Sequence, residues 1–524
     1  MKKNNVVKFL MGIVAFLLLL LLITPFIVES LIGRKIAEKL SEKVQDYTVE
    51  IGKVHFSLIR SQIELENITI YSKQDSGADR KFKGEIASIK LKRIGLTKAI
   101  FKKDIDISEI IVSNTNIKGT LPFPEKTRPP VISSLNIRID SIRFDRIELA
   151  IQNTTNAAAY SVKEGVLKIS DFQVQKLDTL MPAIVKHFDF NATEILSVSA
   201  DSMHTFTASG IRFSEISNTL LADSLSMHPN YKDYDYAARH KYQTDRIEAT
   251  LSNVFLHDFS AAGYLKSKKL VSSYLEIGKM QVDVFRDKRK KFHHVNKPAF
   301  QDMIYDYAGP INIDSIGLQS GNVVYTEHGE KANEPGRMSF NKISAKIYKI
   351  SNDTIYKTEK GFFKINAKAL LMNKARITLL LKGRIFDRQN TISVNGTLSE
   401  MAVKVLNPML EKNAFIYATS GIIDKMNFSF TADNSKASGK MILLYHDLNI
   451  AVKNKRTDDT TALKERVTSI IANIKILNSN PLPDKGVREG IIEYERDPER
   501  FVFNYFGKSI LTGIKSSIVN SPKK

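Results

Sequence analysis

Apolar and polar residues alternate at every second position over much of the chain, which is the spacing of β-strands and not of helices. The clearest stretch is LNIRIDSIRFDRIELAI at residues 135–151, where polar pairs at Asp140-Ser141 and Asp145-Arg146 separate three alternating runs. An extra residue would turn the following apolar side chains to the opposite face unless the strand bends or bulges there. We therefore predict a bend or bulge at each polar pair and one continuous apolar face.

The same step recurs along the chain as a weak internal repeat. The tripeptide Asp-Ser-Ile marks it at Asp140 and again at Asp314. Further examples separate residues 63–65 from 68–70, 105–107 from 110–112, 167–169 from 172–174, 275–277 from 280–282, and 311–313 from 316–318. The expected fold class is therefore mainly β, an elongated, repetitive and twisted sheet with a few short helices.

A run without charge occupies residues 9–28, FLMGIVAFLLLLLLITPFIV. As a helix it would span roughly 30 Å, the thickness of a bilayer's hydrocarbon core. A cleaved signal peptide is the alternative, but the run is longer than a usual signal core and Val28-Glu29-Ser30 is a poor cleavage site. We predict a retained membrane helix with the N-terminus in the cytoplasm, because the N-terminal tail is short and long domains translocate largely regardless of charge. Its expected anchoring side chains are Phe9, Leu17, Leu20, Ile23 and Phe26.

The sequence predicts four segments: a short tail and membrane helix at 1–28, an amphipathic helix at 29–46, a repeating β body at 47–460 and a helical, capping region at 461–524. The stripe of the second segment suits packing against the first strands, or contact with a membrane surface. Residues 234–242, 298–307 and 402–411 resemble short helices or loops, and 461–477 a longer helix. The last helix, at 501–519, either caps the sheet or seeks a membrane or a partner protein.

The 524-residue chain carries a formal net charge of +21 and no cysteine, which excludes a disulfide scaffold. Its lysines and arginines are spread over the polar strand face, where they keep a large β surface soluble and its edges unpaired. Attraction to anionic lipid headgroups is the functional alternative. No nucleic-acid partner is expected, because the chain shows no aromatic and basic binding platform.

Signals for catalysis and metal binding are weak. The ten histidines are scattered and none forms a His-x-x-x-His pair. His293-His294 follows the basic run at 286–291, which indicates a solvated loop, and His328, between Glu327 and Glu330, indicates a turn. We expect no enzyme activity, no catalytic or metal-ligating residue and no cofactor.

Several segments together resemble the AsmA-like envelope proteins, relatives of the TamB and YhdP group. They are the single membrane helix and amphipathic helix followed by VEIGKVHFSLIRSQIELENITI, then YKDYDYAARHKYQTDRIEA, GNVVYTEHGE, the stretch at 396–452 and the closing FVFNYFGKSILTGIKSS. The resemblance implies a repeating, taco-like β-groove, anchored in the inner membrane of a Gram-negative cell and standing in the periplasm. It also implies that the apolar inner face carries phospholipid acyl chains toward the outer membrane. The motifs are structural and transfer no ligand residues.

An apolar face of this length must be buried by closure of the sheet or by another molecule. The leading hypothesis is phospholipid transfer between inner and outer membrane, which supports envelope integrity. Charges in place of Phe144, Ile316 or Phe428 are expected to block lipid passage in a folded protein. The alternative is a non-enzymatic scaffold or assembly factor for outer-membrane proteins, with a protein partner at the C-terminal region. The expected groove residues are Ile137, Ile139, Ile142, Phe144, Ile147, Leu149, Phe172, Val174, Ile277, Val282, Ile313, Ile316, Leu318, Ile347, Leu379, Leu381, Val394, Phe428, Phe430 and Leu443.

Overall fold

The computed structural model describes residues 47–57, 60–72, 81–95, 104–121, 136–153, 157–174, 183–184, 187–357, 361–452, 476–483 and 485–519. The predicted membrane span at 9–28, with Phe9, Leu17, Leu20, Ile23 and Phe26, lies outside these ranges, as do the predicted helix at 29–46 and residues 461–475. Within the described ranges, no helix is long and apolar enough to cross a bilayer.

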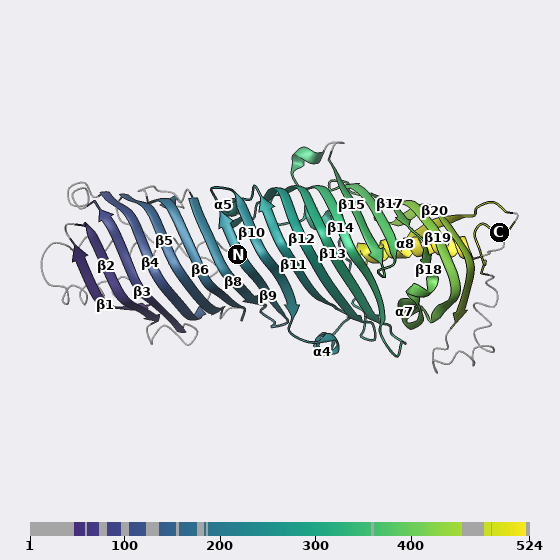
Figure 1. Cartoon of the computed structure of the whole chain (residues 1–524), viewed down its shortest axis with the longest axis horizontal. Coiled ribbons are helices and arrows are strands. Elements are labelled where there is room, and N and C mark those ends of the chain that lie inside the picture. Colours follow the sequence, from purple (N-terminus) through teal and green to yellow (C-terminus); the bar gives the residue numbers. More distant parts are fainter. Residues whose placement is uncertain are drawn as a thin grey trace. The chain divides into compact units, whose positions relative to one another are not determined.

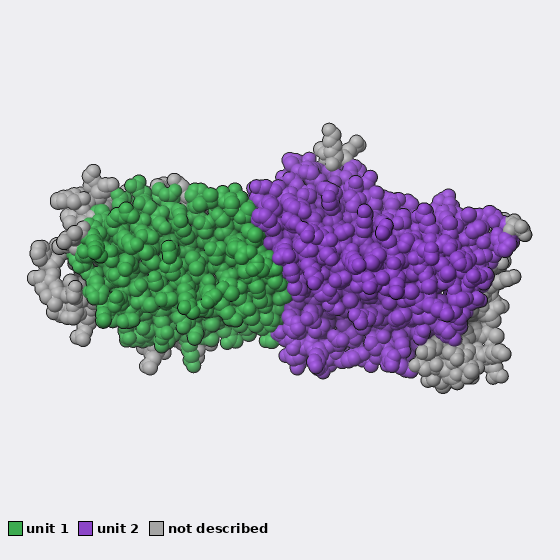
Figure 2. All heavy atoms as spheres, in the orientation of Figure 1, with its two compact units in different colours: residues 1–226, 259–266 green, residues 227–258, 267–524 purple. Residues whose placement is uncertain are grey.

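The chain divides into two compact units, shown in green and purple in Figure 2. Unit 1 comprises residues 1–226 and 259–266, and unit 2 comprises 227–258 and 267–524. Both are built mainly from long strands, as Figure 1 shows, which confirms the mainly β fold class.

Unit 1 contains a sheet in which consecutive strands pair in sequence order. From β1 to β9 the pairs are antiparallel except β4 with β5, which is parallel. The short β7 pairs with the end of β6. The elements are β1 (Tyr47–Ser57), β2 (Gln62–Ser72), β3 (Lys81–Ile94), β4 (Asp104–Leu121), β5 (Asn136–Asn153), β6 (Ala159–Val174), β7 (Ala183–Ile184), β8 (His187–Val198), β9 (His204–Ser214), β10 (Thr219–Pro229), which begins in this unit, and the helix α5 (Ala261–Ser267).

Unit 2 repeats this arrangement, with one parallel pair, β12 with β13, between antiparallel neighbours. Its strands are β11 (Asp245–His257), β12 (Leu270–Asp287), β13 (Ile311–His328), β14 (Gly336–Ser351), β15 (Phe362–Leu371), β16 (Ala375–Arg384), β17 (Ile392–Leu398), β18 (Met401–Ala402), β19 (Ile416–Ala432), β20 (Lys436–Val452) and β21 (Glu489–Glu495). Its helical elements are α4 (Asp233–Ala238), α6 (Phe300–Tyr305), η1 (Thr354–Lys357), η2 (Val403–Leu406), α7 (Asn407–Met409), η3 (Leu410–Ala414) and α8 (Val502–Ile518). Helical residues thus occur at each of the sites predicted near 234–242, 298–307, 402–411 and 501–519.

The predicted bends are present and lie in register from strand to strand. In unit 1 three pairs of facing residues are left out of the regular strand pairing. They are Asn67 with Ala87, Ala87 with Asn114, and Asn114 with Arg146. Asn67, Asn114 and Arg146 have left-handed backbones with φ of 54°, 50° and 56°. The register of β5 with β6 shifts after Phe144, which confirms the bulge at Asp145-Arg146. Because neighbouring strands take the extra residue at the same level, the apolar side chains stay on one face.

The Asp-Ser-Ile repeat marks a second line of bends, found in both units. In unit 1 the facing residues Ser108 and Asp140 are left out of the regular pairing, as are Asp140 and Asp171. The backbone of Asp171 is left-handed, with φ of 54°. In unit 2 Asp314 lies opposite Lys349, whose φ is 60°, and its carboxylate accepts a 2.9 Å hydrogen bond from Lys349 Nζ. The repeat in the sequence therefore records a repeated backbone bend.

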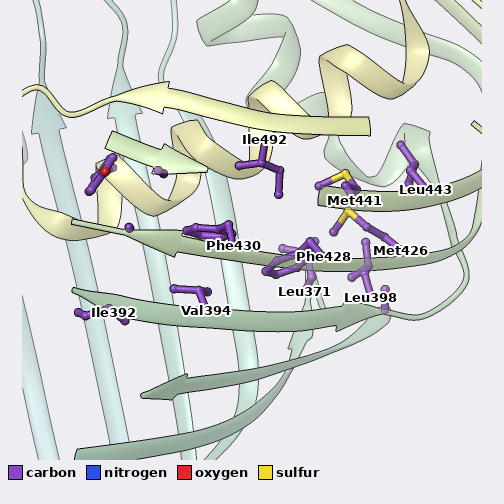
Figure 3. Packing of buried hydrophobic residues seen from close by; sticks show 14 of the residues in the cluster. Leu371, Ile392, Val394, Leu398, Met426, Phe428, Phe430, Met441, Leu443 and Ile492 are labelled. Atoms are coloured by element: carbon purple, nitrogen blue, oxygen red, sulfur yellow. The ribbon is translucent and has the colours of Figure 1, made fainter. Parts of the chain in front are cut away.

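Helix α8 lies against the last two strands of unit 2. Four residues form the buried side of this helix. The first is Tyr505, and three small residues follow it, namely Ser509, Gly513 and Ser517. Figure 3 shows Phe430, Met441 and Ile492 gathered on the side of the strands where this helix runs. The hydroxyls of Ser516 and Thr512 accept hydrogen bonds from the Ile491 and Glu493 amides of β21, at 3.0 and 3.3 Å. The helix thus satisfies polar groups along an edge strand that could otherwise pair with another chain.

We predict that Asn114→Val destabilises unit 1 by about 1–2 kcal/mol, because a β-branched residue is strained at positive φ. Asn114→Gly should leave stability nearly unchanged or raise it. The measurement is the midpoint of urea unfolding. Ser113→Val, next to the bend but in ordinary extended backbone, is the control, and equal effects of the two valine variants would contradict the role of the bend.

We also predict that Gly513→Leu detaches α8, while Gly507→Leu in the same helix does not. A Cβ at Gly513 would lie 2.7 Å from Ile492 Cγ1 and 3.0 Å from Met441 Cε, whereas a Cβ at Gly507 would have no atom within 4 Å. Leucine is the better helix former at both positions, by somewhat under 1 kcal/mol. Hydrogen exchange of the α8 amides should accelerate only in the Gly513 variant, and equal protection in both variants would overturn the packing described.

Candidate functional site

The apolar face of unit 1 is closed over strands β1–β6. Of the expected groove residues, Ile137, Ile139, Ile142, Phe144 and Phe172 are between 0% and 4% exposed. They form one cluster with apolar side chains of β1–β4, and the half-buried Ile147 packs against it. The described members of this cluster all lie on strands, so the apolar side chains of neighbouring strands pack against one another here. Leu149 is half-buried, and the side chain of Val174 lies outside the described part.

In unit 2 the apolar face is closed over the later strands. Ile313, Val394, Phe428, Phe430 and Leu443 are between 2% and 6% exposed and share one cluster. Half-buried side chains packed against that cluster include Ile316, Ile347, Leu379 and Leu381.

Helices supply the cover of this second cluster. From α6, the ring of Phe300 lies 5.3 Å from that of Phe363, which is fully buried. The ring of Phe506 in α8 lies 6.0 Å from that of Phe430. Side chains of η2 and the apolar side of α8 pack against the same cluster. Helix α8 therefore covers part of this face with one side, while Phe503 on its outer side is 84% exposed.

The burial changes one expectation about substitutions. Phe144 and Phe428 are each 4% exposed, so a charge at either position would enter a packed cluster. An unpaired buried charge costs several kcal/mol. We therefore now expect charged variants at Phe144 and Phe428 to unfold or lose stability, because the alternating pattern reveals which face a residue lies on but not what covers it.

A different part of the apolar face in unit 2 remains half-covered. Ile277, Val282 and Leu318 are half-buried, and none belongs to the packed cluster. Strand pairing places them among six other half-buried aliphatic side chains: Ile277 lies opposite Leu318, and Val282 lies between Ala249 and Val323. We call this set the aliphatic stripe. Its members are Ile247, Ala249, Leu251, Ile277, Met280, Val282, Val284, Leu318 and Val323.

One margin of the aliphatic stripe is ionic. Arg286, two residues beyond Val284, donates two hydrogen bonds to the Asp245 carboxylate, at 2.6 and 2.5 Å. Burial lowers the pKa of Arg286, but the charge and hydrogen bonding of Asp245, with smaller contributions from Tyr325 and Glu327, together outweigh burial and the net shift is upward. Burial, together with Glu327, raises the pKa of Tyr325, whose hydroxyl donates to Glu327 Oε2 at 2.5 Å. The aliphatic surface thus ends in a polar border whose charged groups are paired.

The basic run at 286–291 is therefore not simply a solvated loop. Lys288 Nζ lies 2.8 Å from Glu327 Oε1, and Arg289 pairs with Asp287, whose pKa the Arg289 hydrogen bond lowers. The sequence interpretation missed these pairs because their acidic partners lie on other strands or at a strand end.

The buried side chain of His328 makes hydrogen bonds that hold neighbouring segments together. It is 4% exposed, its Nδ1 lies 2.8 Å from the Tyr234 hydroxyl, and its Nε2 donates to the Ala332 carbonyl at 2.9 Å. These contacts connect α4 to the end of β13. Over the described ranges, no group of three or more histidine, aspartate or glutamate side chains is placed to hold a metal ion.

No protein-family model matches the chain, and no curated protein does. The functional interpretation therefore relies on the residues themselves.

Proposed function

We propose that the protein binds lipid acyl chains on its apolar face and transfers phospholipid between the two membranes of a Gram-negative envelope. It would be held by the span at 9–28 in the inner membrane, with its β body forming a groove in the periplasm. The observation that carries this proposal is the aliphatic stripe, a row of aliphatic side chains that the described parts of the chain leave half-covered.

The chemistry of the stripe suits acyl chains. It is aliphatic along three adjacent strands, and its members carry no hydrogen-bonding side chain. Covering it contributes roughly 25 cal/mol per Å² of apolar surface, or about 0.8 kcal/mol per buried methylene. Because these contacts are not directional, a chain can slide along the stripe without breaking a specific bond. Such a surface holds lipid and also releases it, which transfer requires.

The membrane parts of the proposal come from the sequence. The uncharged run at 9–28 has the length of a bilayer span, and the segments quoted above resemble AsmA-like proteins. The formal charge of +21 is compatible with attraction to anionic headgroups.

We predict that a photoactivatable amino acid at Val282 crosslinks to phospholipid in cells, and that the same group at Gln281 does not. The two positions are neighbours on β12 whose side chains point to opposite faces. The measurement is mass spectrometry of the crosslinked peptide. Lipid adducts of equal yield at both positions would contradict binding to the apolar face.

The double variant Ile277→Glu, Val282→Glu should lose lipid binding and lipid-transfer function while the protein remains folded. Half-buried side chains can reach water, so the charges cost less here than in the packed clusters. Ser252→Glu on the polar face, opposite Lys279, adds a charge where it can be neutralised and serves as the matched control. Retained lipid binding in the double variant, with an unchanged unfolding midpoint, would argue against the stripe.

A scaffold for outer-membrane proteins is the second candidate, and the closed clusters favour it. Where the apolar face is 0–6% exposed, as at Ile139 and Ile313, it offers no surface to lipid. In a scaffold the stripe would be covered by a protein partner. Crosslinking at Val282 would then yield a defined protein adduct in place of lipid, so the same experiment separates the two functions.

A further inference from the structure

A hollow lies on the polar face of unit 2, on the opposite side of the sheet from the packed cluster. Its volume is about 440 Å³, and Tyr348, Phe362, Lys364 and Lys382 line it. Strand pairing places Tyr348 of β14 opposite Lys364 of β15, and Lys364 opposite Lys382 of β16. The proposed lipid face plays no part in it, because the neighbouring Phe363 points into the cluster and is fully buried.

The two lysines are like charges held directly opposite each other. Such a cross-strand pair is unfavourable unless an anion lies between the ammonium groups. Among the described residues neither Lys364 nor Lys382 forms an ion pair or a side-chain hydrogen bond.

Unit 1 contains the same arrangement with its anion supplied. Lys83 lies opposite Lys118, but Glu85 Oε1 is 2.6 Å from Lys83 Nζ. The hydrogen bond and charge of Lys83 lower the pKa of Glu85, and Lys118 adds to the effect. The opposed lysines at Lys364 and Lys382 therefore lack a carboxylate that the comparable pair possesses.

The walls of the hollow are aromatic and exposed. Tyr348 is 37% exposed and Phe362 is 50% exposed, although both lie on the polar face. The guanidinium of Arg384 lies 5.9 Å from the Phe362 ring centre, and its buried Nε has no hydrogen-bond partner among the described residues. Flat apolar rings next to several cations suit a ligand with an anionic group on an apolar or sugar-like body.

We propose that this hollow binds a phosphate-bearing ligand, with Lys364 and Lys382 on either side of the phosphate and the rings of Tyr348 and Phe362 against the rest of the molecule. Lysine ammonium groups bind phosphate as point charges and need no fixed geometry, in contrast to a bidentate arginine. A phosphate offers several anionic oxygens, so a single group can neutralise both lysines. The ligand is either a phospholipid headgroup or a free phosphate ester.

The absence of tryptophan from the sequence allows a local test. In the full chain, purified in an uncharged detergent, Phe362→Trp would introduce the only indole and place it in the hollow. Its fluorescence is titrated with inorganic phosphate, with glycerophosphoglycerol and with dihexanoyl phosphatidylglycerol. We expect a saturable change with the phosphate esters. Tighter binding of the lipid than of glycerophosphoglycerol would identify a lipid headgroup as the source, and equal binding would identify a free ester.

The lysines are tested in the same background. Lys364→Gln with Lys382→Gln should weaken binding by at least roughly tenfold, the effect of losing a charged hydrogen bond. Lys83→Gln with Lys118→Gln removes the same charge from the comparison pair and should leave binding unchanged. Phosphorus NMR line broadening of glycerophosphoglycerol with the unsubstituted protein confirms that the indole does not create the site.

A lack of saturable response in both measurements would overturn the proposal, as would equal affinity before and after substitution of Lys364 and Lys382. Glycerophosphoglycerol has no acyl chains for the aliphatic stripe to hold. A failure here therefore leaves the lipid-transfer proposal standing, and a failure of lipid transfer leaves this site standing.

Discussion

Every bent strand of this protein must accommodate an extra residue without turning its apolar side chains to water, and its neighbour must do so at the same level. The matched bends meet this constraint. Across the antiparallel pair, the left-handed Asn114 lies opposite Ala87, which is not left-handed, whereas in the parallel pair Asn114 and Arg146 are both left-handed. If one strand lost its bend, the register would slip and its apolar side chains would leave the cluster.

The apolar face runs through many strands, but some parts of it are packed and another part is only half-covered. Over β1–β6, and where α6 and α8 lie on the sheet, the apolar side chains form an ordinary packed core. Along β11–β13 it remains half-covered and ends in an ionic border whose charges are already paired. The described protein atoms thus leave an aliphatic surface whose further cover must come from elsewhere, and this is the physical basis of the proposed lipid binding.

The sequence predicted the mainly β fold and the bends of β5, because these depend on local alternation and on polar steps such as Asp140-Ser141. It did not predict the depth of burial. Phe144 and Val282 carry the same signal, yet one is packed and the other half-covered, since the difference depends on distant segments. The ionic partners of Arg286 and the opposed lysines Lys364 and Lys382 were equally out of reach, because strand register brings them together and no motif marks it.

The central claim is that phospholipid covers the aliphatic stripe, and native mass spectrometry of the full chain purified in mild, uncharged detergent tests it most directly. We expect bound phospholipid on the unsubstituted chain, loss of that lipid in the Ile277→Glu, Val282→Glu variant and its retention in Ser252→Glu. A lipid-free, monodisperse protein, or phospholipid bound equally by all three chains, would contradict it.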